Sequence, residues 1–182
     1  MKLLIASDIH GDINSANTVA KAYRESGADR LVLLGDLLYH GPRNDLPAGY
    51  APKKVIELLN NLKNEILAVR GNCDTEVDQM VLDFPILADY AFIECNGVRM
   101  FVTHGHKFNT QNPPPLKTGD ILLHGHTHVS GVTPFGNGNL YINPGSVSIP
   151  KENTPKGYIL FDSEAEQKFT FKTLNGEVYL AF

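Results

Sequence analysis

The segment KLLIASDIHG, residues 2–11, joins a short apolar run to two polar side chains. Residues 2–7 have the length and composition of a buried strand, and Asp8 and His10 follow at its end. The run is too short for the hydrophobic region of a signal peptide, and the two polar residues interrupt it at once. We therefore expect a buried strand that carries a carboxylate and an imidazole at its carboxyl end.

Strand and helix signals alternate outward from this segment through the first half of the chain. Apolar runs typical of buried strands are separated by stretches with helical periodicity. This βαβαβ order predicts a parallel sheet. The expected strands are residues 2–7, 30–34 and 65–69, and the expected helices are residues 16–25 and 52–62.

The second half indicates mostly antiparallel strands with little helix between them. Asn96-Gly97 is a preferred pair for a tight hairpin turn, and it separates two apolar runs. No linker or internal repeat interrupts the chain, so we expect one α/β domain, residues 1–182, of two packed sheets with helices outside. The strands expected in this half are residues 91–95, 98–103, 121–123, 140–142, 157–161 and 169–173.

Composition and charge narrow the class of protein. The 182 residues are 42% hydrophobic and 20% charged, as in a soluble globular protein. The net charge of −4 argues against a broad basic face for nucleic acid, and no stretch has the roughly 20 apolar residues of a membrane helix. Cys73 and Cys95 form neither a disulfide framework nor a C-x-x-C pair. These features favour a cytoplasmic protein with reduced thiols.

Side chains that can bind metal ions follow five of the expected strands. Open α/β sheets bind ligands beyond the carboxyl ends of their strands, so these side chains should meet at one edge. Residues i and i+2 of an extended segment point the same way, which would let each D-x-H or H-x-H pair face a common centre. The donors are Asp8, His10, Asp36, Asn72, His104, His126 and His128.

Carboxylate, imidazole and amide donors suit Mn²⁺, Fe, Zn²⁺ or Ni²⁺ better than a soft metal. Seven donors exceed what one tetrahedral ion uses, but they fit two ions that share a bridging carboxylate. Two-metal phosphoesterase sites hold their ions roughly 3.5–4 Å apart. The residue types therefore predict a dinuclear centre.

The order of these motifs resembles that of the calcineurin-like metallophosphoesterase superfamily, D-x-H, G-D, G-N-H-[DE], H and G-H-x-H, which runs here from Asp8 to His128. Within it, the small size and compact spacing are similar to those of bacterial phosphodiesterases. The resemblance implies a four-layer α/β/β/α sandwich of two mixed sheets flanked by helices. It also implies a phosphoric diester hydrolase that uses two divalent ions, with Mn²⁺ favoured and Zn²⁺, Fe or Ni²⁺ as alternatives.

Roles follow from the resemblance, motif by motif. It implies one ion on Asp8, His10 and His128, a second on Asn72, His104 and His126, and Asp36 bridging the two. A hydroxide shared by the ions would attack phosphorus in line.

One motif position departs from the pattern, because Cys73 stands where the superfamily has histidine. In the family that histidine, oriented by the following acid, assists the phosphate oxygens or protonates the leaving group. Asp74 is retained, but a thiol donates hydrogen bonds weakly. We therefore assign Cys73 a catalytic position and expect a preference for diesters with acidic leaving groups over monoesters.

Several assignments near the motifs stay open. His124 alternates with His126 and His128, so the pair of metal ligands could instead lie one step earlier along the strand, at His124 and His126. The G-H-x-H frame, however, selects His126 and His128. We expect His106 to face solvent. Residues 39–51 and 105–119 are long irregular segments in which we expect substrate specificity to reside. Basic residues that could pair with a substrate phosphate are Arg43, Arg70 and Lys107.

The expected partner is a small phosphodiester or nucleotide-like substrate, without membrane or nucleic acid. Two alternatives use the same fold: a phosphomonoesterase or protein phosphatase, and a non-catalytic protein-binding scaffold such as the eukaryotic retromer subunit of the superfamily. Loss of metal ligands would mark a scaffold, and none of the seven is missing here. The oligomeric state is open, and a homo-oligomer is compatible with the sequence.

Overall fold

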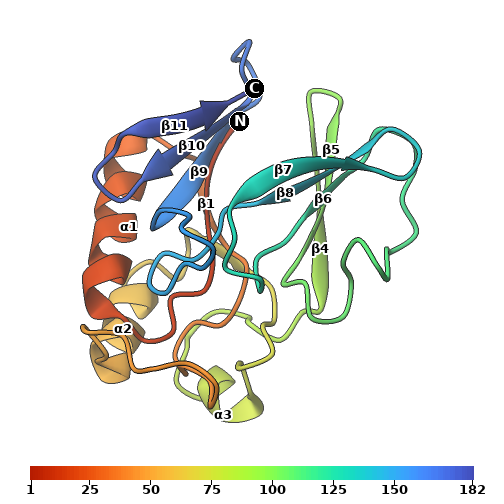
Figure 1. The fold of residues 1–182 in the computed structure, drawn as a ribbon. Helices are drawn as coiled ribbons and strands as arrows, with labels where there is room; N and C mark the ends of the chain where they lie inside the picture. Colours follow the sequence, from red (N-terminus) through yellow and green to blue (C-terminus); the bar gives the residue numbers. More distant parts are fainter.

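Two mixed β-sheets lie face to face in the computed structural model, which describes residues 1–182 (Figure 1). The first sheet has six strands in the order β11-β10-β9-β1-β2-β3, and the second has five in the order β4-β5-β6-β8-β7. Both chain termini lie at one end of the molecule, and the loops after β1, β2 and β3 lie toward the other (Figure 1). The two mixed sheets confirm the predicted α/β fold class.

The first sheet contains the predicted parallel unit, since β1 pairs in parallel with β2 and β2 with β3. The last three strands of the chain extend this sheet on the other side of β1, where β9 is antiparallel to β1. The six strands are β1 Lys2–Ala6, β2 Arg30–Leu33, β3 Ile66–Ala68, β9 Gly157–Asp162, β10 Phe169–Thr173 and β11 Val178–Ala181.

Helices α1 (Ile13–Ser26) and α2 (Pro52–Asn60) cover the outer face of this sheet (Figure 1). The first helix begins three residues before the predicted start because the Asp12 side chain accepts a hydrogen bond from the Asn14 amide and caps it. Gly27 ends it in the left-handed conformation. A single turn, α3 (Glu76–Gln79), was not predicted.

The second sheet begins with the predicted hairpin. Asn96 and Gly97 have φ of 47° and 75°, as a type I′ turn requires, and Cys95 pairs with Val98. However, β6 is parallel to both of its neighbours, so the centre of this sheet is not antiparallel as expected. The strands are β4 Tyr90–Cys95, β5 Val98–Thr103, β6 Ile121–Leu123, β7 Gly131–Phe135 and β8 Asn139–Asn143.

The parallel pair β5 and β6 needs a crossover connection, and residues 105–119 provide it without a helix. The Phe108 ring packs edge-on against Phe101 on this sheet, with ring centroids 5.6 Å apart. The Pro113-Pro114-Pro115 run lacks the amide hydrogens that a helix needs. Helices therefore flank the first sheet, while an irregular segment packs on the outer face of the second.

Alternate residues of β1 divide the core in two. Leu4 and Ala6 pack toward the helices, whereas Leu3 and Ile5 pack toward the second sheet, as the period of a strand requires. All four side chains are at most 2% exposed. This burial fixes the position of the β1 carboxyl end, where the polar residues of the first motif follow. No helix of the structure is long and apolar enough to cross a membrane.

Candidate metal centre

The loops that follow β1, β2, β3, β5 and β6 converge between the two sheets, and the seven predicted donors lie on them. Backbone hydrogen bonds join the first two loops, because the amides of Asp8 and His10 donate to the carbonyls of Gly35 and Asp36 at 3.2 and 2.9 Å. The predicted convergence of strand ends at one edge is therefore present in the structure.

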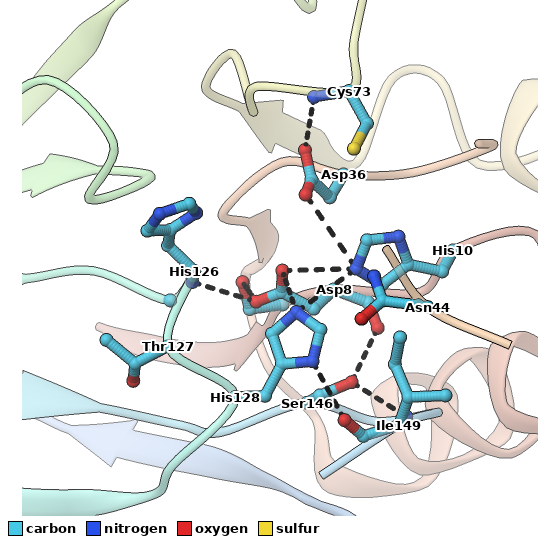
Figure 2. Close-up of polar contacts among 12 residues, drawn as sticks. Asp8, His10, Asp36, Asn44, Cys73, His126, Thr127, His128, Ser146 and Ile149 are labelled. Atoms are coloured by element: carbon cyan, nitrogen blue, oxygen red, sulfur yellow. Dashed lines mark hydrogen bonds and ion pairs between the residues drawn. The ribbon is translucent and has the colours of Figure 1, made fainter. Parts of the chain in front are cut away.

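Asp8, His10 and His128 form one side of the cluster (Figure 2). Asp8 Oδ1 lies 3.5 Å from His10 Nε2 and 3.2 Å from His128 Nε2. The two imidazole Nε2 atoms lie 3.2 Å from each other. All three residues are buried, with 3% exposure at most. Three electron-pair donors thus surround one point.

His104, Asn72 and His126 form the other side. His104 Nε2 lies 3.1 Å from both Asn72 Oδ1 and His126 Nδ1. Asp36 stands between the two sides, because its Oδ2 lies 3.5 Å from His104 Nε2 and 3.7 Å from His10 Nε2. A carboxylate in this position could bridge two metal ions.

Three of the histidines are held in one tautomer by backbone carbonyls. The Nδ1–H groups of His10, His104 and His128 donate to the carbonyls of Tyr39, Leu34 and Ile149 at 2.7, 2.6 and 2.8 Å. A carbonyl can only accept, so Nδ1 bears the proton and the Nε2 lone pair faces the cluster. Such a second shell is usual around metal-binding histidines.

The protonation of the cluster also fits a cation. Burial alone would raise the pKa of Asp8, but the neighbouring imidazoles of His10 and His128 hold it well below its usual value. Burial would lower the pKa of His104, but Asp36 and Asp8 raise it to about 9. Asp8 Oδ1 is buried without a hydrogen-bond partner. The carboxylates thus attract positive charge, which a proton on His104 supplies in the absence of metal and which metal ions could supply in its place.

The donors are not aligned in the way the sequence suggested. Asp8, His10, Asp36, His126 and His128 all have left-handed backbone conformations, with φ between 49° and 67°. The argument from alternation along an extended segment was therefore wrong, because these residues lie beyond the strands. Their side chains meet because the backbone turns sharply at each donor.

Asp74 holds two of these turns, a role that the sequence did not reveal. Its carboxylate accepts hydrogen bonds from the backbone amides of Asp36, Leu37 and Gly71 at 2.8, 2.9 and 2.7 Å. In this chain the acid that follows Cys73 makes these hydrogen bonds to the backbone. The residues around Asp74 carry no local signal for contacts that span up to 38 positions in the chain.

Serine side chains fix Asp8, and they too were missed. Ser7 Oγ donates to Asp8 Oδ2 at 2.6 Å. Ser146 and Ser148 both donate to the Asp8 carbonyl at 2.8 Å, from a segment more than 130 residues away in the chain. Asp8 Oδ2 also accepts from the His126 amide at 3.0 Å, which ties the first motif to the last.

Cys73 is buried beside this cluster and lines the adjacent pocket. Burial and the neighbouring Asp36 raise the pKa of its thiol, so the sulfur is protonated at neutral pH. Asn72 Nδ2 lies 3.3 Å from the sulfur. The Cys73 amide donates to Asp36 Oδ1 at 2.8 Å (Figure 2). The residue can therefore act as a weak donor but not as a thiolate nucleophile.

The structure separates the histidines that the sequence left open. His124 Nδ1 faces the Gly125 carbonyl and its ring packs on Tyr141, so it does not reach the cluster, whereas His126 and His128 do. His106 was expected in solvent, but it is half-buried, with its ring centroid 5.5 Å from that of His104. Burial lowers the pKa of His106 to about 4, so it is neutral.

The three basic candidates also differ. Arg70 pairs with Glu76 at 3.4 Å, and Lys107 pairs with Asp89 at 2.7 Å. Arg43 takes part in neither of these ion pairs, and it lines the pocket beside the cluster. Residues 41–44 of the first irregular segment line this pocket, whereas no residue of segment 105–119 does.

Comparisons with known proteins agree with this geometry. Residues 1–166 match the model of the calcineurin-like phosphoesterase superfamily domain. The chain is 49% identical over 164 residues to phosphodiesterase YfcE of Escherichia coli K12, which covers 90% of this chain and 89% of that one. The crystal structure of E. coli YfcE, described as a phosphoesterase, superposes with a TM-score of 0.94 over 100% of this chain and 98% of that chain, at 45% identity.

A more distant structure shares the fold alone. Vps29 of Entamoeba histolytica in complex with Zn²⁺ aligns with a TM-score of 0.59 at 18% identity, over 100% of this chain and 99% of that chain.

The chain belongs to the calcineurin-like phosphoesterase superfamily. The predictions of this family, of its α/β fold and of a phosphodiester-hydrolysing enzyme are therefore confirmed.

Substitution of Gly71 tests how closely its loop must pack against the loop that carries Asp36. A Cβ at this position would lie 2.1 Å from Asp36 Oδ1 and 2.3 Å from the Asp36 amide nitrogen, so Gly71→Ala must displace that loop. We expect a loss of about 2 kcal/mol or more in the free energy of unfolding, measured in urea, and weaker Mn²⁺ binding in calorimetry.

Gly131→Ala is the matched control, because a Cβ there would meet nothing within 4 Å. It should leave Mn²⁺ binding unchanged. Equal Mn²⁺ affinity in Gly71→Ala and the wild type would show that the close approach of the two loops is unnecessary for the centre.

Proposed function

We propose that this chain hydrolyses small phosphodiesters at a dinuclear metal centre held by its seven convergent donors. The observation that carries the proposal is the position of Asp36, whose Oδ2 lies within 3.7 Å of an imidazole nitrogen on each side of the cluster. One carboxylate between two sets of nitrogen and oxygen donors is the arrangement that two neighbouring ions require.

Each side would hold one ion. Asp8, His10 and His128 would bind the first, and Asp36 would bridge. The donors of the second would be Asn72, His104 and His126, for which the 3.1 Å separations are the support. Mn²⁺ is the ion we favour, since a hard oxygen and imidazole set without a thiolate suits it.

When bound, the pair of cations supplies Lewis-acid charge and lowers the pKa of a water that can attack phosphorus. The protein contributes a rigid frame, because backbone carbonyls fix three imidazoles and Asp74 fixes the turn that carries Asp36. This fixed orientation means that little reorganisation is needed as charge develops on the phosphoryl oxygens.

The protonated Cys73 thiol lines the pocket where the family has histidine. It can stabilise an oxygen only weakly, and it offers no strong acid for a departing alkoxide. This supports a diester with an acidic leaving group as substrate, rather than a monoester. We propose a single domain over residues 1–182 and, because both cysteines are free thiols, a cytoplasmic location.

A scaffold role is not favoured. The conversion of this fold to a protein-binding module would remove selection for the metal site, yet all seven donors are present and gathered in one cluster. Metal content and turnover, measured together, separate the two functions.

Removal of metal should abolish activity. After dialysis against a chelator, we expect hydrolysis of bis(p-nitrophenyl) phosphate to fall to the background rate, since attack on a diester at neutral pH depends on the cations. Added Mn²⁺ should restore hydrolysis, which is measured by the release of p-nitrophenolate. Undiminished turnover in the chelated protein would rule out the proposed chemistry.

Substitution of single histidines should test the assigned frame. His126→Ala should lower bound Mn²⁺ from about two ions per chain to about one, because the second ion loses a donor. His124→Ala, the matched control one step along the motif, should retain about two. Elemental analysis of the gel-filtered variants measures this, and the reverse result would move the frame by two residues.

Cys73→His should shift substrate preference. An imidazole there can protonate a leaving group that the thiol cannot, so we expect turnover of p-nitrophenyl phosphate to rise by about tenfold or more relative to bis(p-nitrophenyl) phosphate. Cys73→Ala serves as the comparison and should leave the ratio near that of the wild type. An unchanged ratio in both variants would remove Cys73 from the catalytic account.

A further inference from the structure

A pocket of about 380 Å³ adjoins the candidate metal centre, and two cationic side chains line it in addition to the metal donors. Five of the metal donors and Cys73 form one part of the lining. Among the remaining residues, Arg43 and Lys151 are the only two with cationic side chains. The others are Gly41, Pro42, Asn44 and Thr127.

Neither cation is neutralised by the protein. Asp45 and Glu152 are close to them in sequence, but no carboxylate lies within 4.0 Å of Arg43 or Lys151. Two like charges on one pocket, beside a centre that would hold further cations, repel each other. An anion in the pocket would relieve this repulsion.

The turn that carries Arg43 is attached to one metal donor. His10 Nδ1 donates to the carbonyl of Tyr39, just before this turn, at 2.7 Å. The turn is closed by Asn44, whose amide donates to Gly41 at 3.3 Å and whose Nδ2 donates to His40 at 2.8 Å. Arg43 therefore projects from a backbone whose position is set relative to His10.

The turn that carries Lys151 is attached to another donor. The Lys151 amide donates to the His128 carbonyl at 3.0 Å, and His128 Nδ1 donates to Ile149 at 2.8 Å. Thr154 closes the turn, since its amide and hydroxyl both donate to the Lys151 carbonyl. Because His10 and His128 face each other, the two cations come from loops on either side of this pair.

We propose that Arg43 and Lys151 form a subsite for a second phosphate group of the substrate, separate from the phosphodiester that is cleaved. The inference rests on the proposed function and specifies its substrate class: a small phosphodiester, nucleotide-like in size, that bears an additional phosphomonoester. The metal centre receives the reacting group, and the two side chains receive the dianionic group that is left intact. Arginine and lysine are the residues that bind phosphate in proteins, the former through paired N–H donors.

The competing assignment places both cations on the phosphate that reacts. The two assignments differ in what a second phosphate changes. If the cations contact the reacting group, their removal weakens every diester equally; if they contact a second phosphate, only substrates that bear one are affected.

A matched pair of chromogenic probes separates these cases: thymidine 5′-(p-nitrophenyl phosphate) and the same compound with a 3′-phosphate. With Mn²⁺ present, we expect wild-type kcat/KM to be about tenfold higher for the 3′-phosphorylated probe. Arg43→Gln and Lys151→Gln should each reduce this ratio by about three- to tenfold, because the loss in kcat/KM falls mainly on the phosphorylated probe.

Lys54→Gln is the control, since Lys54 is exposed on α2 and outside the pocket, and it should keep the wild-type ratio. A wild-type ratio near one, or equal losses on both probes in the two pocket variants, would overturn the subsite. Hydrolysis of the unphosphorylated probe tests the proposed function by itself, so the two failures are distinguishable.

Calorimetry gives a readout that does not depend on turnover. Thymidine 3′,5′-bisphosphate should bind the Mn²⁺-loaded protein about tenfold more tightly than thymidine 5′-monophosphate, and Arg43→Gln should remove most of that difference. Equal affinities of the two nucleotides for the wild type would contradict the subsite even if neither chromogenic probe were hydrolysed.

Discussion

The candidate centre depends on a backbone constraint: five of its seven donors occupy the left-handed region, which residues with a Cβ enter at about 1 kcal/mol or more each. Such turns persist only where the surrounding structure holds them. Here buried carboxylates do so, because Asp74 accepts three backbone amides, Asp36 accepts that of Cys73, and Asp8 accepts that of His126. The same hydrogen bonds therefore offset both the conformational strain of the turns and the cost of removing the carboxylates from water.

Asp8 and Asp36 therefore have two separate tasks, one for each carboxylate oxygen. Oδ2 of Asp8 binds Ser7 and the His126 amide, which leaves Oδ1 toward His10 and His128. In Asp36 the assignments are reversed, with Oδ1 on the backbone and Oδ2 toward the imidazoles. Because the same residues hold the loops and face the cluster, metal binding and local folding are coupled, and an ion that binds only the folded state stabilises it.

The sequence predicted the parts of the structure that follow from local pattern. Apolar runs located β1, β2 and β10, and Asn96-Gly97 located the hairpin, since strand burial and turn chemistry are visible over a few residues. The order of the motifs predicted which donors would meet. It could not predict Asp74 or Ser146 as anchors, because those hydrogen bonds join residues 38 and 138 positions apart. Two strands were missed: β7, whose residues 131–135 contain Gly131 and Pro134, and the exposed edge strand β11, although Val178 to Ala181 form an apolar run.

The distribution of charge favours a small substrate over nucleic acid. The chain has a net charge of −4, while Arg43 and Lys151 are two uncompensated cations beside the centre. A long polyanion would meet the acidic remainder of the surface, where repulsion acts over a Debye length of about 8–10 Å. In the proposed arrangement, a compact molecule with two phosphate groups would place one at the metal centre and the other at Arg43 and Lys151. Under the proposed function, we therefore expect a small ligand that carries both phosphate groups, rather than nucleic acid, to occupy this pocket.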